Sequence, residues 1–323
     1  MKFFITGGAG YIGSHVGKLL QENGHKVVIF DDFSNGLKRR TDSYFDQVIT
    51  GNILDKELIK KHLQNVDTVI HLAGKKAVGE SVIKPDFYYE NNVIGSKMIL
   101  EAMVEAGISK IIFSSTAVVY APNDSGVFTE EDRLESSSPY GSNKIEVEKL
   151  IESYCKNQGF AAFSLRYFNV LGCSDPKLSD NSIENLVPKV FKTIDLGERP
   201  VIYGDDYNTV DGTCIRDYVH IEDIAQAHLK LIDHFIKSTN QIYNIGTGVG
   251  TSVRRIFNTI DRVCKINSNP VVVGRRDGDL DTLISNVDKL SKKTNWRPNK
   301  SIDEMIISSW NGWNYLKGVK IDS

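Results

Sequence analysis

The 323-residue chain is poor in cysteine, with only four. They are widely spaced, and none forms the Cys-x-x-Cys pair that is typical of metal or redox sites. We therefore assign no chemistry and no metal to them and expect reduced thiols that pack in the core. Their positions are Cys155, Cys173, Cys214 and Cys264.

Long apolar runs and an excess of charge of one sign are also missing. No run approaches the roughly eighteen apolar residues that span a bilayer, and the first residues do not follow the pattern of a signal peptide. The net charge is -2, and the longest basic run is Lys38, Arg39 and Arg40. These features argue against a membrane segment and a nucleic-acid surface. We expect a cytoplasmic protein in which this basic run is a solvated loop.

A glycine-rich turn follows the first apolar run. Gly7, Gly10 and Gly13 lie between a predicted strand at 2–6 and a predicted helix, where they would let a pyrophosphate approach the helix N-terminus. The second predicted strand ends at Asp31, which could accept hydrogen bonds from a ribose. The combination predicts a dinucleotide site. Because Asp31 would repel a 2′-phosphate, it favours NAD over NADP.

Apolar segments continue to alternate with helical patterns at least as far as residue 113. This order predicts an α/β fold with a doubly wound, parallel Rossmann-type sheet and a smaller mixed α/β substrate-binding lobe. We assign residues 1–172 to the NAD-binding domain and 173–323 mainly to the lobe, with segments near 214–246 returning to the first domain. In such sheets ligands bind at the carboxyl ends of the strands.

Tyr140 and Lys144 lie one turn apart at the start of a predicted helix. A phenol has a pKa of about 10, so it needs a nearby cation to act as a base near neutrality. The same spacing also suits a surface tyrosine and lysine. Ser114, Ser115 and Thr116 follow a predicted strand, where hydroxyls usually cap a turn but could bind a substrate oxygen. The pair is a hypothesis that depends on its surroundings.

Eight motifs in order resemble those of extended short-chain dehydrogenases/reductases, and specifically of the UDP-glucose 4-epimerases. They are TGGAGYIGSH (6–15), AVGES (77–81), YYENNV (88–93), FSST (113–116), SPYG (138–141), LRYFN (165–169), DGT with IRDYVH (211–220) and RRDGD (275–279). The resemblance implies a tightly held NAD, a UDP-hexose substrate, C4 epimerisation through a transient 4-keto sugar, and a homodimer formed through helices near 85–106 and 140–157.

The resemblance also implies a role for each matching residue. Tyr140 would be the base, Lys144 would hold the nicotinamide ribose and lower the tyrosine pKa, and Thr116 would bind the 4-oxygen of the sugar. The implied NAD-binding residues are Gly7, Gly10, Tyr11, Ile12, Gly13, Asp31, Asn35, Asn52, Ile53, Leu72, Ala73, Gly74, Lys76, Asn91, Ser114, Tyr140, Lys144 and Tyr167. The implied substrate-binding residues are Lys76, Thr116, Tyr140, Phe168, Asn169, Asn185, Leu186, Arg216, Arg276, Asp279 and Leu283. His15 and His220 are interpreted as structural.

Departures from the family pattern separate the possible reactions. Dehydratases and decarboxylases carry a carboxyl group just after the Ser-Thr, where this chain has Ala117 and Val118, so simple return of the hydride is expected. Asn52 stands in place of an aspartate that would bind adenine. Leu283 lies where side-chain bulk is thought to limit the 2-substituent of the hexose. Epimerisation of UDP-N-acetylglucosamine or UDP-glucuronate therefore stays open, as do a nucleotide-sugar oxidoreductase and a non-catalytic NAD-sensing protein.

Overall fold

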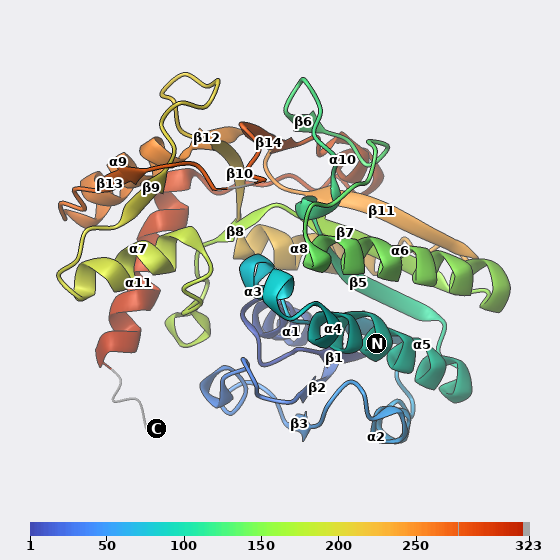
Figure 1. Ribbon diagram of the computed structural model, residues 1–323. Coiled ribbons are helices and arrows are strands. Elements are labelled where there is room, and N and C mark those ends of the chain that lie inside the picture. Colours follow the sequence, from blue (N-terminus) through green and yellow to red (C-terminus); the bar gives the residue numbers. More distant parts are fainter. Residues whose placement is uncertain (277, 319–323) are drawn as a thin grey trace.

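The computed structural model describes residues 1–276 and 278–318, so Asp277 of the RRDGD motif lies outside the described residues (Figure 1). The strands are β1 (Lys2–Thr6), β2 (Lys26–Asp31), β3 (Gln47–Thr50), β4 (Thr68–His71), β5 (Lys110–Thr116), β6 (Val127–Phe128), β7 (Ala161–Tyr167), β8 (Asn169–Leu171), β9 (Val201–Tyr203), β10 (Ile215–His220), β11 (Thr239–Ile245), β12 (Gly250–Ser252), β13 (Val271–Val273) and β14 (Thr282–Ser285). The α-helices are α1 (Tyr11–Glu22), α2 (Lys56–His62), α3 (Val78–Ile83), α4 (Pro85–Tyr89), α5 (Gly95–Ala106), α6 (Pro139–Gln158), α7 (Leu186–Asp195), α8 (Ile221–Leu231), α9 (Val253–Cys264), α10 (Asp288–Thr294) and α11 (Ile302–Gly318).

Seven parallel strands form the main sheet, in the order β11-β7-β5-β4-β1-β2-β3. Their sequences are nearly continuous apolar runs because helices cover both faces of the sheet. The predicted doubly wound parallel sheet is confirmed. β11 joins it beside β7, although α7, β9 and β10 lie between these two strands in the sequence. The domain boundary at residue 172 stays a prediction.

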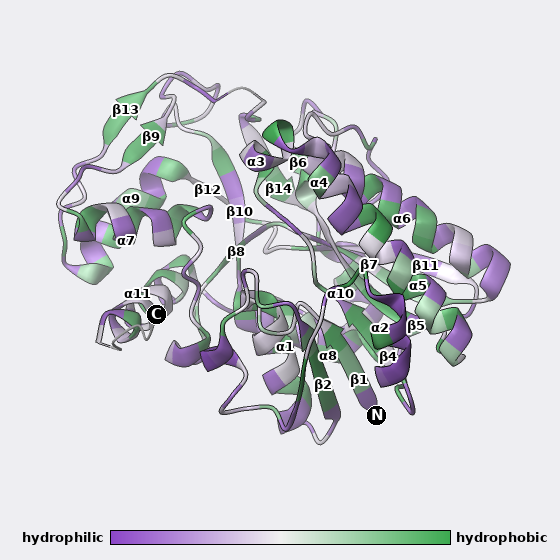
Figure 2. Ribbon diagram, turned by 60° about the horizontal axis from the view of Figure 1, so that its bottom comes forward, coloured by the Kyte–Doolittle hydropathy of each residue, from purple (hydrophilic) through white to green (hydrophobic). Residues whose placement is uncertain are grey.

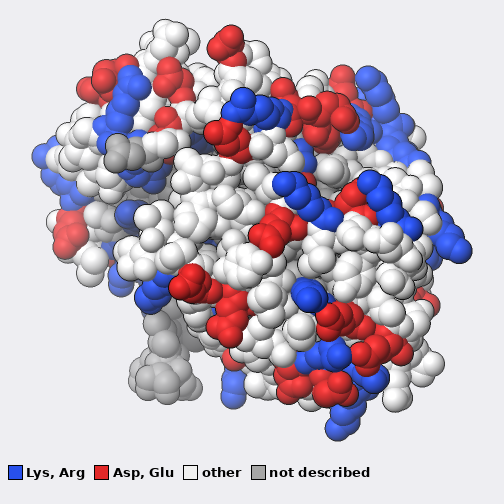
Figure 3. Space-filling model, turned by 45° about the vertical axis from the view of Figure 1, so that its right-hand side comes forward, with Lys and Arg blue, Asp and Glu red and all other residues white. Residues whose placement is uncertain are grey.

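Successive side chains of each strand enter opposite layers of the core. Phe3 and Ile5 pack on the side of α1 and α8, whereas Phe4 packs on the side of α2, α5 and α6. The strand interiors are accordingly apolar in Figure 2. Acidic and basic side chains are interspersed on the surface that Figure 3 shows. In the described parts of the chain, no helix is long and apolar enough to cross a membrane.

The second lobe is mixed α/β, as predicted. Its larger sheet has the order β12-β10-β14-β6 with β8 beside β10, and β13 pairs with β9. A separate core forms between α7, α9 and α11 around Phe191, Phe257 and Trp313. β10 connects this lobe to the main sheet, since Tyr218 on β10 pairs with Asn169 on β8, just beyond β7.

The helix predicted from 85 to 106 is present without a break, but it contains a π-turn at Glu90–Ile94 between α4 and α5. This turn places Asn91, Asn92 and Val93 in the interior. Such turns insert an extra residue into a helix and often occur at functional sites. The sequence pattern did not show it, because apolar spacing hardly differs across one widened turn.

Ile70→Ala is expected to lower the free energy of unfolding by about 2–5 kcal/mol, since it leaves a cavity in a packed core. Ile70 lies on the central strand β4 and is 0% exposed. Val210→Ala is the control, because Val210 is fully exposed and its truncation should change stability by less than about 0.5 kcal/mol. Urea unfolding followed by circular dichroism measures both. Equal effects would contradict the described core.

Candidate active site

The glycine turn between β1 and α1 leaves no room for side chains. Gly7 has φ +70°, and a Cβ on it would lie 2.6 Å from the main-chain nitrogen of Ala73. A Cβ on Gly13 would lie 2.4 Å from the oxygen of Gly7. The N-cap of α1 is Gly10, which has no side chain to occupy the first N–H groups, and Tyr11 and Ile12 follow it. The turn therefore fits a pyrophosphate held by main-chain amides.

Asp31 ends β2 beside this turn and is 7% exposed. Its Oδ2 accepts the N–H of Ala9 at 2.9 Å and its Oδ1 accepts the N–H of Phe33 at 2.8 Å. Burial raises the pKa of the carboxyl, and these two hydrogen bonds oppose the shift. Each oxygen keeps a lone pair for a further donor, which suits a ribose hydroxyl. Asn35 lies exposed in the loop that follows.

Other predicted NAD-binding residues follow β3 and β4. The Oδ1 of Asn52 accepts the N–H of Leu54 at 2.9 Å, so one acceptor position of its amide is already used. Ile53 is buried against Gly95. Leu72, Ala73 and Gly74 continue from β4 toward the glycine turn, and Asn91 is 8% exposed in the π-turn. Lys76 is exposed.

The end of β5 meets the first turns of α6 at the three predicted catalytic residues. Nζ of Lys144 donates to the main-chain oxygen of Ser114 at 2.7 Å and lies 5.9 Å from the centroid of the Tyr140 ring. The main-chain N–H of Tyr140 donates to Oγ of Ser81 at 3.2 Å. Tyr140, Lys144 and Thr116 are 9%, 5% and 9% exposed. The structure thus brings these three side chains together in a nearly dry position.

Burial dominates the electrostatics of this group. It raises the pKa of Tyr140 to about 12, and a hydrogen bond with the Thr116 side chain only partly opposes the shift. Burial also lowers the pKa of Lys144 to about 8, against the effect of the Glu148 carboxylate. In the protein alone burial decides the net direction of both shifts, and the role of Lys144 in lowering the tyrosine pKa stays a prediction. Removing both side chains from water disfavours their charged forms more than their proximity compensates.

Two predicted nucleotide contacts are held by one carboxylate in the second lobe. Arg216 on β10 donates from Nη1 to the oxygen of Leu280 at 2.7 Å, and its Nη2 lies 3.2 Å from Oδ1 of Asp279. Nε of Arg276 donates to Oδ2 of the same Asp279 at 2.9 Å. The side chain of Arg276 is 58% exposed and lies over the ring of Tyr203. Two guanidinium groups and one carboxylate leave a net positive charge, which suits a diphosphate.

The remaining predicted cofactor- and substrate-binding residues lie on several different elements. Tyr167 pairs with Thr116 across the sheet, and its hydroxyl lies 2.9 Å from Nε2 of His228. Leu283 and Phe168 pack in one cluster with Ala117, which directly follows Thr116. Asn169 lies on β8. Asn185 is the N-cap residue of α7, which starts at Leu186, and Nδ2 of Asn185 donates to Oδ2 of Asp180 at 2.5 Å.

Comparison with known proteins places this geometry in a family. Residues 3–246 match the NAD dependent epimerase/dehydratase family. The chain belongs to this family. UDP-glucose 4-epimerase of Erwinia amylovora is 37% identical to it, over 96% of this chain and 97% of the relative. UDP-glucose 4-epimerase of Bacillus subtilis is 34% identical, over 96% of both. A crystal structure of UDP-glucose 4-epimerase from Bifidobacterium longum in complex with NAD+ and UDP is similar with a TM-score of 0.89 at 34% identity, covering 97% of this chain and 98% of that one.

In this member of the epimerase/dehydratase family, the basic run at Lys38–Arg40 is not a solvated loop, and that prediction is wrong. Arg40 is 2% exposed, and its Nη2 donates to the main-chain oxygen of Ser179 at 2.5 Å and to Oδ1 of Asn181 at 3.1 Å. Nε of Arg39 donates to the oxygen of Lys177 at 3.1 Å. The run ties the loop after β2 to residues 174–182, which precede Asn185. Such a contact between distant segments leaves no local pattern in the sequence.

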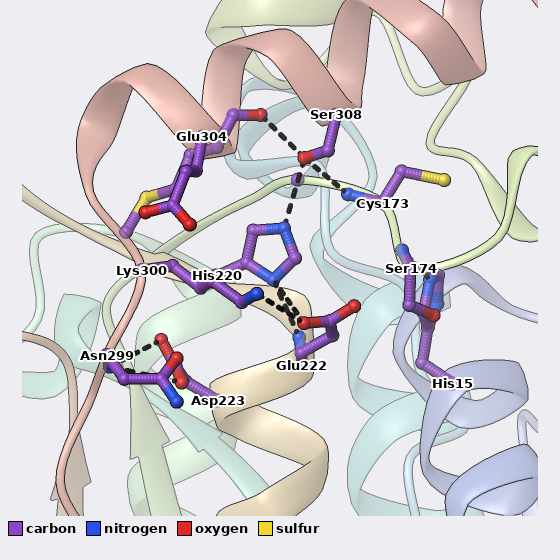
Figure 4. A network of polar contacts seen from close by, with 12 residues as sticks. His15, Cys173, Ser174, His220, Glu222, Asp223, Asn299, Lys300, Glu304 and Ser308 are labelled. Carbon is purple, nitrogen blue, oxygen red and sulfur yellow. Dashed lines mark hydrogen bonds and ion pairs between the residues drawn. The ribbon is translucent and has the colours of Figure 1, made fainter.

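The two motif histidines make contacts that stabilise the joint between the lobes (Figure 4). Nε2 of His15 accepts the N–H of Ser174 at 3.3 Å, and Nε2 of His220 lies 3.0 Å from Oγ of Ser308 on α11. Burial lowers the pKa of His15 to about 3 and that of His220 to about 4, so both are neutral at pH 7. Their contacts agree with the structural interpretation.

Gly13→Ala is expected to weaken NAD binding at least about tenfold, because the added methyl group would push the turn away from its position. Gly79→Ala is the matched control. Gly79 also lies in a helix, but nothing lies within 4 Å of a Cβ built on it, so the change should leave binding intact. Calorimetric titration with NAD, after removal of any retained nucleotide, compares the two. Unchanged affinity in Gly13→Ala would rule out the turn as the pyrophosphate site.

Proposed function

We propose that this protein interconverts UDP-glucose and UDP-galactose by inverting C4 of the hexose, with bound NAD as hydride acceptor and donor. The observation that carries the proposal is the meeting of Tyr140, Lys144 and Thr116 at the carboxyl end of β5, beside the glycine turn. Its support from relatives is the 37% identity to a UDP-glucose 4-epimerase over nearly the full chain.

The residues of the main sheet fit NAD. The glycine turn would hold its pyrophosphate, Asp31 its adenosine ribose and Lys144 its nicotinamide ribose. NAD bound there would supply the hydride acceptor and donor for C4 of the hexose. Asp31 is buried and acidic, so its charge disfavours a 2′-phosphate at the same place.

The protein's own part in the chemistry is to move one proton. Oη of Tyr140 takes the proton of the 4-hydroxyl, while the Thr116 hydroxyl binds that oxygen. Since burial raises the pKa of Tyr140 to about 12, ionisation of its hydroxyl at neutral pH needs added positive charge nearby. Lys144 supplies part of it, because its pKa of about 8 keeps it protonated at pH 7.

The 4-keto sugar has no second acid or base from this strand end. Ala117 and Val118 follow Thr116, and Ala117 is packed in an apolar cluster. Neither can take a proton from the sugar, so neither elimination of water nor decarboxylation has a resident catalyst there. Tyr140 therefore returns the same proton. Arg216 and Arg276 would retain the nucleotide end while the sugar turns.

The direct test is conversion of UDP-galactose to UDP-glucose by purified protein without added cofactor, with UDP-N-acetylglucosamine and UDP-glucuronate offered in parallel. Tyr140→Phe should lower kcat by about 10²–10⁴-fold, since it removes the proton acceptor. Tyr154→Phe, on the same helix but packed against Phe160, should keep full activity. Full activity of Tyr140→Phe, or no turnover of any UDP-hexose, would refute the proposal.

We also infer a homodimer in the cytoplasm. α4, α5 and α6 lie side by side, and exposed apolar side chains on α3 to α5 include Ile83, Phe87 and Val104. All four cysteines are free and buried, which suits a reducing compartment. Sedimentation equilibrium should give twice the 36.1 kDa of the chain. Phe87→Glu should shift the protein toward monomers, because it places a charge in the proposed interface. A wild-type monomer at micromolar concentration would contradict the dimer.

A further inference from the structure

A buried ion pair lies directly behind the catalytic group. Glu148 on α6 and Arg166 on β7 are 4% and 1% exposed. Their contact is bidentate: Nε of Arg166 donates to Oε1 at 3.0 Å and Nη2 donates to Oε2 at 2.7 Å. Such forks fix two side chains in both distance and orientation. Neither residue has a part in the proton transfer described above.

The carboxylate also reaches the strand that carries Thr116. Oγ of Ser115 donates to Oε1 of Glu148 at 2.5 Å. Ser115 stands between Ser114, whose main-chain oxygen accepts from Lys144, and Thr116, whose side chain lies beside the Tyr140 hydroxyl. One carboxylate on α6 therefore fixes the strand end at the residue between its two catalytic contacts. A shift of Ser115 would displace both neighbours relative to α6.

The guanidinium is anchored on its other side. Nη1 of Arg166 donates to Oη of Tyr120 at 3.1 Å and to the main-chain oxygen of Glu130 at 3.1 Å. Tyr120 in turn donates to Oδ1 of Asn244 on β11 at 2.5 Å. The arginine is thus held by three separate segments. It can transmit that rigidity to Glu148.

Charge gives the pair a second effect on Lys144. Glu148 lies one helical turn beyond Lys144, and its carboxylate favours the ammonium form. Among the described residues, the other ionisable groups beside Lys144 are Tyr140 on the same helix and His71 on β4, and Arg166 on β7 contacts Glu148. None of these groups carries a negative charge at neutral pH. Glu148 is therefore the source of negative charge that opposes the loss of the Lys144 proton.

Stability alone does not explain a pair of this kind. Replacing a buried ion pair by apolar side chains is often neutral or stabilising, because two charges have to be removed from water. Removing one partner is damaging, because the other charge is left unpaired. The presence of this buried pair thus points to a requirement for position and charge at this place.

We propose that Glu148 and Arg166 are a positioning pair for the reaction, in which the carboxylate fixes the Ser114–Thr116 strand end and keeps Lys144 protonated while the guanidinium holds the carboxylate in place. Neither residue touches the substrate. The inference rests on the proposed epimerase function, which it deepens by naming what maintains the catalytic lysine.

The test compares pH profiles of kcat in the wild type, Glu148→Gln and the double variant Glu148→Gln/Arg166→Met. Glu148→Gln leaves a lone cation near Lys144, so loss of activity on the alkaline side should begin about one pH unit lower. The double variant removes both charges, so its alkaline limb should lie between the other two. Glu152→Gln is the matched control. Glu152 lies one turn further along α6 with its side chain 42% exposed, so both kcat and the alkaline limb should stay as in the wild type.

A purely structural pair would lower kcat without moving the alkaline limb, and that result would overturn the proposal. The same pH series is measured for binding of NADH to nucleotide-free protein by its fluorescence, because Lys144 is expected to hold the nicotinamide ribose. The wild type could turn over no UDP-hexose while NADH binding is lost on the alkaline side in the expected order, first in Glu148→Gln, then in the double variant and last in the wild type. In that case the proposed function fails and the positioning pair stands. If activity and NADH binding were lost at the same alkaline pH in all variants, the proposed positioning role would be refuted.

Discussion

The hydrogen bond from Lys144 to the main-chain oxygen of Ser114 is the contact on which the rest of the site depends. It joins α6 to the end of β5 and gives a buried ammonium group an acceptor that cannot move away, because the oxygen belongs to a central strand of the sheet. Around this hydrogen bond the side chains are buried, and the charged groups, Lys144 and Glu148, are held in fixed positions. The proposed catalytic group is therefore positioned by the main sheet and α6, whereas Arg216 and Arg276, the arginines proposed to hold the nucleotide, belong to the second lobe.

Much of this arrangement could be predicted from the sequence because it follows from local order. Strands alternating with helices predict a parallel sheet, and the carboxyl ends of parallel strands meet at one edge. Thr116, Gly74 and the glycine turn at Gly7 each follow a strand, so their proximity is a consequence of topology. Tyr140 and Lys144 come near them because α6 packs against β5. Local spacing was sufficient for these residues.

What the sequence could not predict depends on distant contacts or on burial. Asp279 bridges Arg216 and Arg276, yet nothing in its spacing identifies one carboxylate as the partner of both. Glu148 and Arg166 look like an ordinary helix glutamate and a strand arginine until the fold brings them together. The raised pKa of Tyr140 in the protein alone could not be predicted either, because desolvation depends on every atom packed around the ring.

The tie between Arg40 and Ser179 has a consequence for how such proteins can vary. It joins two positions 139 residues apart, one in the loop after β2 and one in the segment that precedes α7. A hybrid that took its second lobe from a relative would inherit a new 174–182 segment while keeping the old arginines. The buried guanidinium would then face acceptors that had not been shaped for it. Exchanging one lobe without the other would therefore leave a buried charge without its acceptors.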